Sequence, residues 1–177
     1  MDERRNIYLV GLMGAGKTTV GRQLARRLGR QFFDSDHEIV ERTGVPIPTI
    51  FEIEGEAGFR RREAHAIAEL TQIDNIILAT GGGAVLDPAN RASLRDTGWV
   101  VYLNVSPRLL YERTKNDRTR PLLSVGDPLT KLEELYRQRD PLYREVAHIV
   151  VEGSHLVAAG IVQYLIREFG RQCKRQN

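Results

Sequence analysis

Cysteine is nearly absent from this chain of 177 residues, in which Cys173 is the single example. One thiol cannot form a disulfide within the chain and cannot supply a cysteine-based metal cluster. The sequence therefore predicts a protein suited to a reducing compartment and held together by its core. The histidines show no metal-ligand spacing, and we expect all of them to be structural or exposed: His37, His65, His148 and His155.

Long apolar runs are absent as well, and no stretch is long enough to span a bilayer. The first six residues are mostly charged or polar, where an export signal would carry an apolar segment. We therefore expect a cytoplasmic protein that has no membrane partner.

An excess of charge of one sign is also lacking, since 26 Lys and Arg residues face 23 Asp and Glu residues, a net charge of +3. The arginines are scattered, whereas nucleic-acid-binding proteins gather them into a stripe, so we expect no nucleic acid partner. A hydrophobic content of 41% is enough for a core, and we predict one domain over residues 1–177. Nothing in the sequence demands an assembly, and we expect a monomer.

The chain does contain a glycine-rich loop at residues 11–18, which reads Gly-Leu-Met-Gly-Ala-Gly-Lys-Thr and fits the P-loop pattern G-x-x-x-x-G-K-[ST]. The apolar residues 7–10 before it predict a buried strand. Residues 19–28 after it carry apolar side chains at helical spacing. A strand, a glycine loop and a helix are the context that the motif needs, which disfavours the alternative of a glycine turn that binds nothing.

This loop predicts a site for nucleotide phosphates. Its glycines let the amide N–H groups turn inward around an anion, and the helix that follows adds the positive end of its dipole. Lys17 can reach the outer phosphates, and the Thr18 hydroxyl can ligate Mg²⁺. The residues expected to hold the nucleotide are Gly14, Ala15, Gly16, Lys17, Thr18 and Thr19.

Apolar strands and amphipathic helices alternate along the rest of the chain. Further strands are predicted at 32–33, 76–79, 99–103 and 149–151. Helices are predicted at 37–42, 49–54, 56–70, 88–95, 107–114, 129–143 and 156–169. This alternation predicts an α/β protein, a three-layer α/β/α fold with a five-stranded parallel sheet and helices on both faces.

Three unusual features each follow a predicted strand: the phosphate loop, the pair Asp34 and Asp36, and the run Gly81-Gly82-Gly83. Ligands of parallel sheets bind at the carboxyl ends of the strands. We therefore expect these features to meet in one crevice.

Two patterns bear on the class of P-loop protein. Residues 114–117 fit the guanine-reading pattern [NT]-K-x-D of GTPases, but they follow a helix, and the chain contains no Asp-x-x-Gly. The third strand lacks a Walker B aspartate, and Glu152 after the last strand is better interpreted as a surface residue. We therefore place the carboxylate for Mg²⁺ at Asp34. A metal ligand, an acceptor pocket and a lid suit a small-molecule kinase.

From about Asn6 to Phe169 the chain resembles the shikimate kinase family. The motifs that carry the resemblance are residues 11–18, 33–36, 59–63, 81–83, 120–123 and 139–143. It implies phosphorylation of the 3-hydroxyl of shikimate by MgATP, in the route to chorismate and the aromatic amino acids. The substrates are then shikimate and ATP, with one Mg²⁺ for each protein chain.

The resemblance also assigns roles on the nucleotide side. Lys17 contacts the β- and γ-phosphates, while Thr18 and, through water, Asp34 hold Mg²⁺. Arg120 comes from a lid at about residues 115–127 and reaches the phosphates.

On the acceptor side, the resemblance implies a substrate-binding segment at about residues 34–62. Asp36 binds the shikimate hydroxyls and is the candidate base, and Arg60 and Arg139 hold the carboxylate. The backbone amides of Gly81, Gly82 and Gly83 face the substrate. Guanidinium forks suit a planar carboxylate, and an ionised aspartate suits vicinal hydroxyls.

Each of these residues has a plainer interpretation. Arg60 begins the run Arg60-Arg61-Arg62, which without the resemblance would indicate a solvated helix face. Asp36 could also be the N-cap of the helix that begins at His37. The alternatives for the whole chain are a kinase of another hydroxy acid, such as gluconate, and a non-catalytic nucleotide-binding relative.

Overall fold

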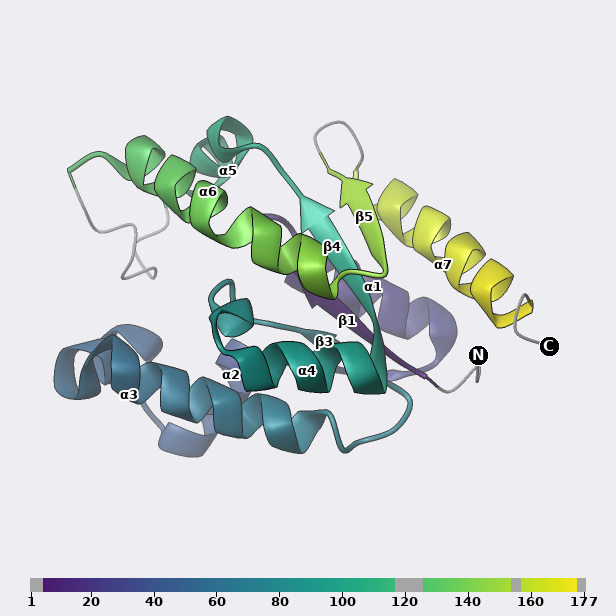
Figure 1. The fold of residues 1–177 in the computed structure, drawn as a ribbon, viewed down its shortest axis with the longest axis horizontal. Coiled ribbons are helices and arrows are strands. Elements are labelled where there is room, and N and C mark those ends of the chain that lie inside the picture. Colours follow the sequence, from purple (N-terminus) through teal and green to yellow (C-terminus); the bar gives the residue numbers. More distant parts are fainter. Residues whose placement is uncertain (1–4, 117–125, 154–156, 175–177) are drawn as a thin grey trace.

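The structure is a computed structural model, and it describes residues 5–116, 126–153 and 157–174. Its five strands all pair in parallel, in the order β2-β3-β1-β4-β5 (Figure 1). They are β1 (Asn6–Val10), β2 (Gln31–Asp34), β3 (Ile76–Ala79), β4 (Gly98–Asn104) and β5 (Ile149–Glu152). The predicted five-stranded parallel sheet is confirmed.

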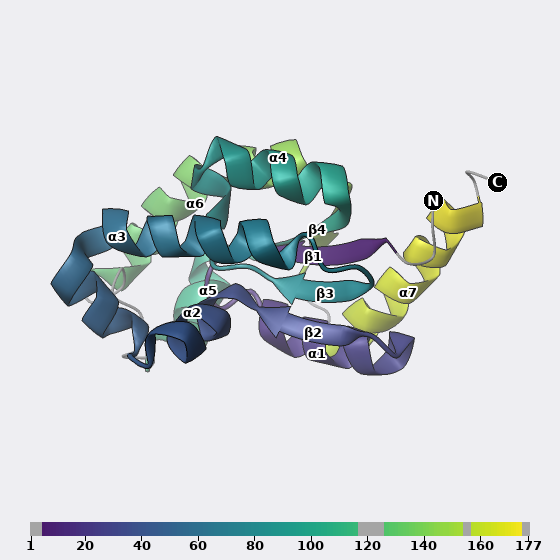
Figure 2. The ribbon, with the colours of Figure 1, turned by 90° about the horizontal axis from the view of Figure 1, so that it is seen from below.

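Helices cover both faces of this sheet, as predicted (Figure 2). α1 (Lys17–Leu28) packs with α7 (Ala158–Lys174) on one face, and α4 (Pro88–Thr97) and α6 (Pro128–Val146) lie on the other, with α3 (Ile47–Leu70) beside α4. The remaining elements are α2 (Ser35–Thr43), the short 3₁₀ helix η1 (Ala84–Leu86) and α5 (Pro107–Thr114). None of the helices within the described ranges is long and apolar enough to cross a membrane.

Strand burial follows from this layering. Every residue of β1, β3 and β4 is buried, because both faces of these central strands are covered. The edge strands β2 and β5 are mostly half-buried. The central strands therefore fix the ends from which the loops of the crevice depart.

The largest differences between predicted and observed helix ends occur at two helices. The helix predicted at 129–143 begins at Pro128, where the Asp127 side chain accepts from Thr130 N at 3.2 Å, and it continues to the buried Val146. The helix predicted at 156–169 begins at Ala158 within the described residues and runs to Lys174. Apolar spacing does not reveal such an extension, because the residues after 169 are mostly polar.

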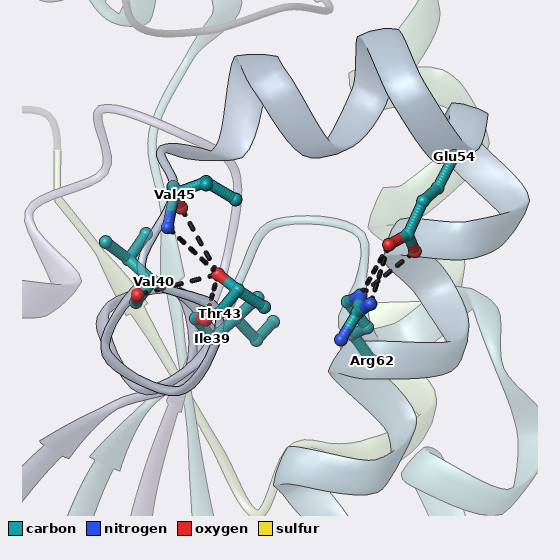
Figure 3. A network of polar contacts seen from close by, with 6 residues as sticks. All are labelled: Ile39, Val40, Thr43, Val45, Glu54 and Arg62. Atoms are coloured by element: carbon teal, nitrogen blue, oxygen red, sulfur yellow. Dashed lines mark hydrogen bonds and ion pairs between the residues drawn. The ribbon is translucent and has the colours of Figure 1, made fainter.

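A kink at Gly55 divides α3 where the sequence predicts two helices, 49–54 and 56–70. Gly55 has φ 71° and ψ 179°, a left-handed conformation that favours glycine. Across the kink, Arg62 Nη2 donates to Glu54 Oε1 at 2.6 Å and Arg62 Nε donates to Glu54 Oε2 at 2.9 Å (Figure 3). This bidentate pair holds the two halves of α3 at a fixed angle.

The turn from α2 to α3 is held by the Thr43 hydroxyl together with a backbone bond from Gly44 N to Val40 O at 2.9 Å. Thr43 Oγ1 donates to Ile39 O at 2.8 Å and accepts from Val45 N at 3.4 Å (Figure 3). Asp36 stands in the first turn of α2 and Arg60 lies in the second half of α3. The Thr43 turn and the Gly55 kink therefore set where these two side chains stand relative to each other.

Candidate active site

The phosphate loop follows β1 and opens directly into α1, as the motif predicts. Gly16 is the N-cap of α1, with φ 96°, a backbone conformation open chiefly to glycine. Lys17 Nζ donates to the carbonyls of Gly11 (2.7 Å) and Leu12 (2.9 Å), so its ammonium group lies over the loop. A cation and the positive helix end therefore face the same point, which suits a phosphate.

Asp34 connects the phosphate loop to α2. Its Oδ2 accepts from the Thr18 hydroxyl at 2.7 Å, and its Oδ1 accepts from Asp36 N at 3.0 Å and from His37 N at 3.4 Å. Asp34 is therefore the N-cap of α2, and the interpretation of Asp36 as the cap is wrong. The cap lies at the last strand residue because β2 ends there, one residue before the helix begins.

The Thr18 and Asp34 oxygens fit a Mg²⁺ ion. Mg²⁺ prefers oxygen ligands and is usually held by one or two carboxylates together with waters and substrate phosphates. A hydroxyl and a carboxylate beside a phosphate loop are such a set. No group of three or more His, Cys, Asp or Glu side chains that could hold a metal occurs in the residues described, and Mg²⁺ at this position does not need one.

Two of the three consecutive glycines, Gly81 and Gly83, leave room for charged side chains, and Gly82 lies beside a third. A Cβ on Gly81 would lie 2.5 Å from Glu63 Oε1 and 2.7 Å from Asp36 Oδ1, and a Cβ on Gly83 would overlap the Arg60 guanidinium. The Cβ position of Gly82 lies 3.6 Å from Arg139 Nη1. The turn at 81–83 is thus the point at which the predicted acceptor residues meet.

The backbone of this turn is anchored on two sides. Gly81 N donates to the buried Ser35 Oγ at 2.9 Å, so this amide already has a partner. Gly82 O accepts from the Tyr143 hydroxyl, which comes from the last turn of α6. Neither Ser35 nor Tyr143 is given a role by the sequence.

Arg60 points away from solvent into this cluster. Its Nη1 donates to Glu63 Oε2 at 2.7 Å and its Nη2 donates to Glu56 Oε1 at 3.2 Å. Glu63 is 1% exposed, and burial raises the pKa of its carboxyl to about 7 although Arg60 opposes the rise. The interpretation of Arg60 as part of a solvated face is therefore wrong.

Arg139 is a second buried charge beside the turn at 81–83, since it is 2% exposed. Its Nε and Nη1 are buried and have no hydrogen-bond acceptor in the part of the chain that the structure describes. Burial lowers the pKa of the guanidinium, the Tyr143 hydroxyl opposes that shift, and the nearby charge of Arg60 adds to it. A buried cation with open donors beside a second cation is an arrangement that an anion would stabilise.

One crevice of about 970 Å³ joins the phosphate loop to Asp36 and the glycine turn. Its walls include the whole loop from Gly14 to Thr19, together with Asp34, Asp36, Gly81 and Gly82. Arg60 and Arg139 stand beside it, against Gly83 and Gly82. The expected meeting of the three features at one edge of the sheet is confirmed.

Some predictions fall on residues outside the described ranges. Arg120 and most of the lid predicted at 115–127 lie there, and so does His155. The GTPase-like pattern begins at the end of α5, where Thr114 is buried and Lys115 pairs with Glu112 at 2.6 Å. Glu152 is exposed, as expected, and it accepts from Asn104 Nδ2.

Sequence reasoning missed the crevice residue Arg113, whose Nη1 donates to Gly14 O at 3.2 Å. It also missed Glu63 and Tyr143, although both lie inside motifs that the sequence singles out. Nothing in their spacing distinguishes them from the charged and aromatic side chains of an ordinary amphipathic helix. Their place next to the glycine turn is a property of the fold alone.

The parallel sheet, the phosphate loop and the crevice define a P-loop kinase of small molecules. The family model for shikimate kinase matches residues 13–169. The chain is 79% identical over 171 residues to a shikimate kinase of Dechloromonas aromatica (strain RCB), with 97% of this chain and 93% of the relative covered.

Solved structures agree. A shikimate kinase from Acinetobacter baumannii in complex with shikimate has a TM-score of 0.94 and 51% identity, with 96% of this chain and 95% of that chain covered. The shikimate kinase from Aquifex aeolicus has a TM-score of 0.84 and 32% identity, with 95% and 98% covered. The chain belongs to the shikimate kinase family. Its activity is the ATP-dependent phosphorylation of shikimate, a step in the synthesis of aromatic amino acids.

Proposed function

We propose that the crevice transfers the γ-phosphoryl group of ATP to the 3-hydroxyl of shikimate, with the nucleotide on the phosphate loop and the acid beside the glycine turn. The observation that carries this assignment is Arg139, whose buried guanidinium has open donors next to Arg60. Two guanidinium groups suit the carboxylate of a small acid, because each offers paired N–H donors to a planar pair of oxygens.

On the nucleotide side, the backbone amides of residues 14–19 hold the phosphates, and Lys17 turns from its loop carbonyls toward the β- and γ-oxygens. Thr18 and, through water, Asp34 would hold one Mg²⁺, and when bound this ion neutralises charge on the phosphates. Arg120, from a lid at about 115–127, adds positive charge at the transferred group. Catalysis of this kind depends on positioning and charge neutralisation.

On the acceptor side, Asp36 orients the substrate hydroxyls and accepts the proton from the 3-hydroxyl as the new P–O bond forms. Asp34 is engaged by Thr18 and by the backbone of α2 on the nucleotide side, whereas Asp36 Oδ1 lies against the glycine turn, 2.7 Å from the Cβ position of Gly81. Gly82 lines the crevice and allows the ring of the substrate to approach the backbone, and the absent side chain of Gly83 leaves room for the Arg60 guanidinium. Arg60 and Arg139 fix the ring by its carboxylate.

We also propose that the chain works as a single domain and a cytoplasmic monomer, without a nucleic acid or membrane partner. All residues assigned here come from one chain, so the site needs no second copy.

An ADP-release assay with MgATP tests the proposal. It compares shikimate, shikimate methyl ester, gluconate and no acceptor. We expect release with shikimate and a large loss with the ester, because the ester removes the charge that the two arginines bind. Analysis of the product by NMR locates the phosphate on the ring. Release with gluconate alone, or equal rates with the acid and the ester, would contradict the assignment of the acceptor pocket.

A further inference from the structure

Tyr143 contacts the glycine turn on the acceptor side of the crevice. Neither the sequence motifs nor the proposed mechanism gives it a role. It stands in the last turn of α6 and is 0% exposed. We infer that Tyr143 is a positioning residue whose hydroxyl fixes the glycine turn at 81–83 to the Arg139 guanidinium. This inference rests on the proposed function, since it deepens the account of the same pocket.

The hydroxyl of Tyr143 acts on both parts. It donates to Gly82 O, and it lies one helical turn from Arg139 on α6, where it opposes the fall in the guanidinium pKa that burial causes. A phenol has one O–H to donate and lone pairs to accept, so a donor bond to the carbonyl leaves the lone pairs for Arg139. One oxygen atom therefore sets the distance between the backbone turn and the guanidinium.

The turn is placed so that its position matters for the donor nucleotide as well. The Cβ position of Gly82 lies 3.4 Å from Met13 N and 3.6 Å from both Gly11 O and Arg139 Nη1. Gly82 therefore separates the phosphate loop from the arginine. A shift of the turn would change the alignment of an acceptor held by Arg139 with a phosphoryl group on the loop, and such misalignment is costly in phosphoryl transfer.

The ring of Tyr143 cannot easily move away from this position. It packs on the Tyr102 ring with centroids 4.9 Å apart and an interplanar angle of 30°. Burial raises the pKa of the Tyr143 hydroxyl, so this group stays protonated and remains a donor at neutral pH. Packing and protonation thus both keep the hydroxyl directed at Gly82.

The test compares Tyr143→Phe with a matched control, Tyr8→Phe. Tyr8 is also 0% exposed, and its hydroxyl contacts Asn6 Nδ2 at 2.9 Å and Thr97 Oγ1 at 2.8 Å, away from the glycine turn. We expect Tyr143→Phe to raise the KM for shikimate by about tenfold, to lower kcat, and to leave the KM for ATP unchanged. Tyr8→Phe should change the melting temperature and none of these constants.

Rescue separates the hydrogen bond from the packing. Replacing Tyr143 with 4-aminophenylalanine restores a donor toward Gly82 O, and we expect it to recover most of the shikimate KM. If Tyr143→Phe does not fold, the 4-aminophenylalanine variant can still test the inference. A shikimate KM that differs from the wild-type value although the donor is restored would contradict a role for that donor. Wild-type constants in Tyr143→Phe, or equal changes in both Phe variants, would overturn the inference.

A second readout does not depend on the substrate. Amide hydrogen exchange of residues 81–86, measured without ligands, should become about tenfold faster in Tyr143→Phe and should not change in Tyr8→Phe. If the wild type failed to phosphorylate shikimate, the proposed function would fail, while faster exchange would still support the anchoring role of Tyr143. Unchanged exchange would overturn that role whatever the substrate is.

Discussion

The two halves of the crevice are built in different ways. The phosphate-binding part of the nucleotide half comes from one contiguous stretch, residues 11–19, and works largely through its backbone and the start of α1. The acceptor half brings side chains from α2, α3 and α6 to the turn at 81–83, across more than one hundred residues of chain. A phosphate site can thus be made locally, whereas a site that selects one small acid depends on tertiary packing.

Lys17→Ala should cause the largest loss of turnover, and it should affect the nucleotide half alone. It removes the ammonium group that lies over the loop, and we expect kcat to fall by about 10³-fold, since the loss of one preorganised donor at a developing charge costs on that order. Shikimate binding, measured by calorimetry without nucleotide, should persist. Loss of shikimate binding together with turnover would show that the two halves are not separable at Lys17.

Asp36→Asn sharpens the boundary between the halves. Asparagine keeps the size of the side chain and can still orient a hydroxyl, but it cannot accept the proton, so we expect kcat to fall by roughly 10²-fold or more. The affinity for MgADP should not change, because Asp34 and not Asp36 is bonded to Thr18. A matching loss of MgADP affinity would instead place Asp36 in the metal site.

The difference between the halves explains what the sequence can and cannot predict. The loop, its strand and its helix form a motif with fixed spacing, so each phosphate-loop residue can be assigned by position. The sheet is equally predictable, because its central strands are short apolar runs between helices. The kink at Gly55 coincides with the gap between two predicted helices for a similar reason, since glycine interrupts a helical pattern.

The acceptor residues could not be derived in this way. Arg60, Arg61 and Arg62 are equivalent in sequence, but the phase of α3 directs Arg60 to Gly83 and Arg62 to Glu54. Only the resemblance to a family distinguishes Arg60 beforehand. Glu63 and Tyr143 matter because they touch glycines far away in the chain, and no local pattern encodes such contacts.

Arg139→Lys tests the acceptor half at the more buried of its two arginines. Lysine keeps the positive charge but loses the planar fork, and two charge-assisted hydrogen bonds become at most one. We expect the KM for shikimate to rise by about 10- to 100-fold, with the KM for ATP unchanged. Arg144→Lys is the matched control, because Arg144 lies on the same helix and pairs with Asp140 near the surface. An equal rise in both KM values would place Arg139 outside the acceptor pocket.

The smallest expected effect concerns the carboxyl that the acceptor half buries. Burial raises the pKa of Glu63 to about 7 in the folded protein, above the 4.5 expected for an unperturbed glutamate. Between pH 4.5 and about 7, the Glu63 carboxyl binds more protons in the folded state than in the unfolded state. The contribution of Glu63 to stability is therefore greatest at low pH and is lost as pH rises through about 7. Above both pKa values, the ionised Glu63 carboxyl lowers the free energy of unfolding by roughly 3 kcal/mol relative to the protonated carboxyl.

Glu63→Gln removes this titration and keeps an acceptor for Arg60. Urea unfolding from pH 5 to pH 8 should therefore show the variant gaining stability relative to the wild type as pH rises, with other titrating groups cancelling in the difference. Glu56→Gln is the control for the loss of a carboxylate partner of Arg60, because Glu56 also bonds Arg60 but its side chain is 50% exposed. If the free energies of unfolding of the wild type and Glu63→Gln changed in parallel with pH, Arg60 would keep Glu63 ionised in the fold. The acceptor half would then hold a fixed ion pair, where we expect a carboxyl that takes up a proton as pH falls below about 7.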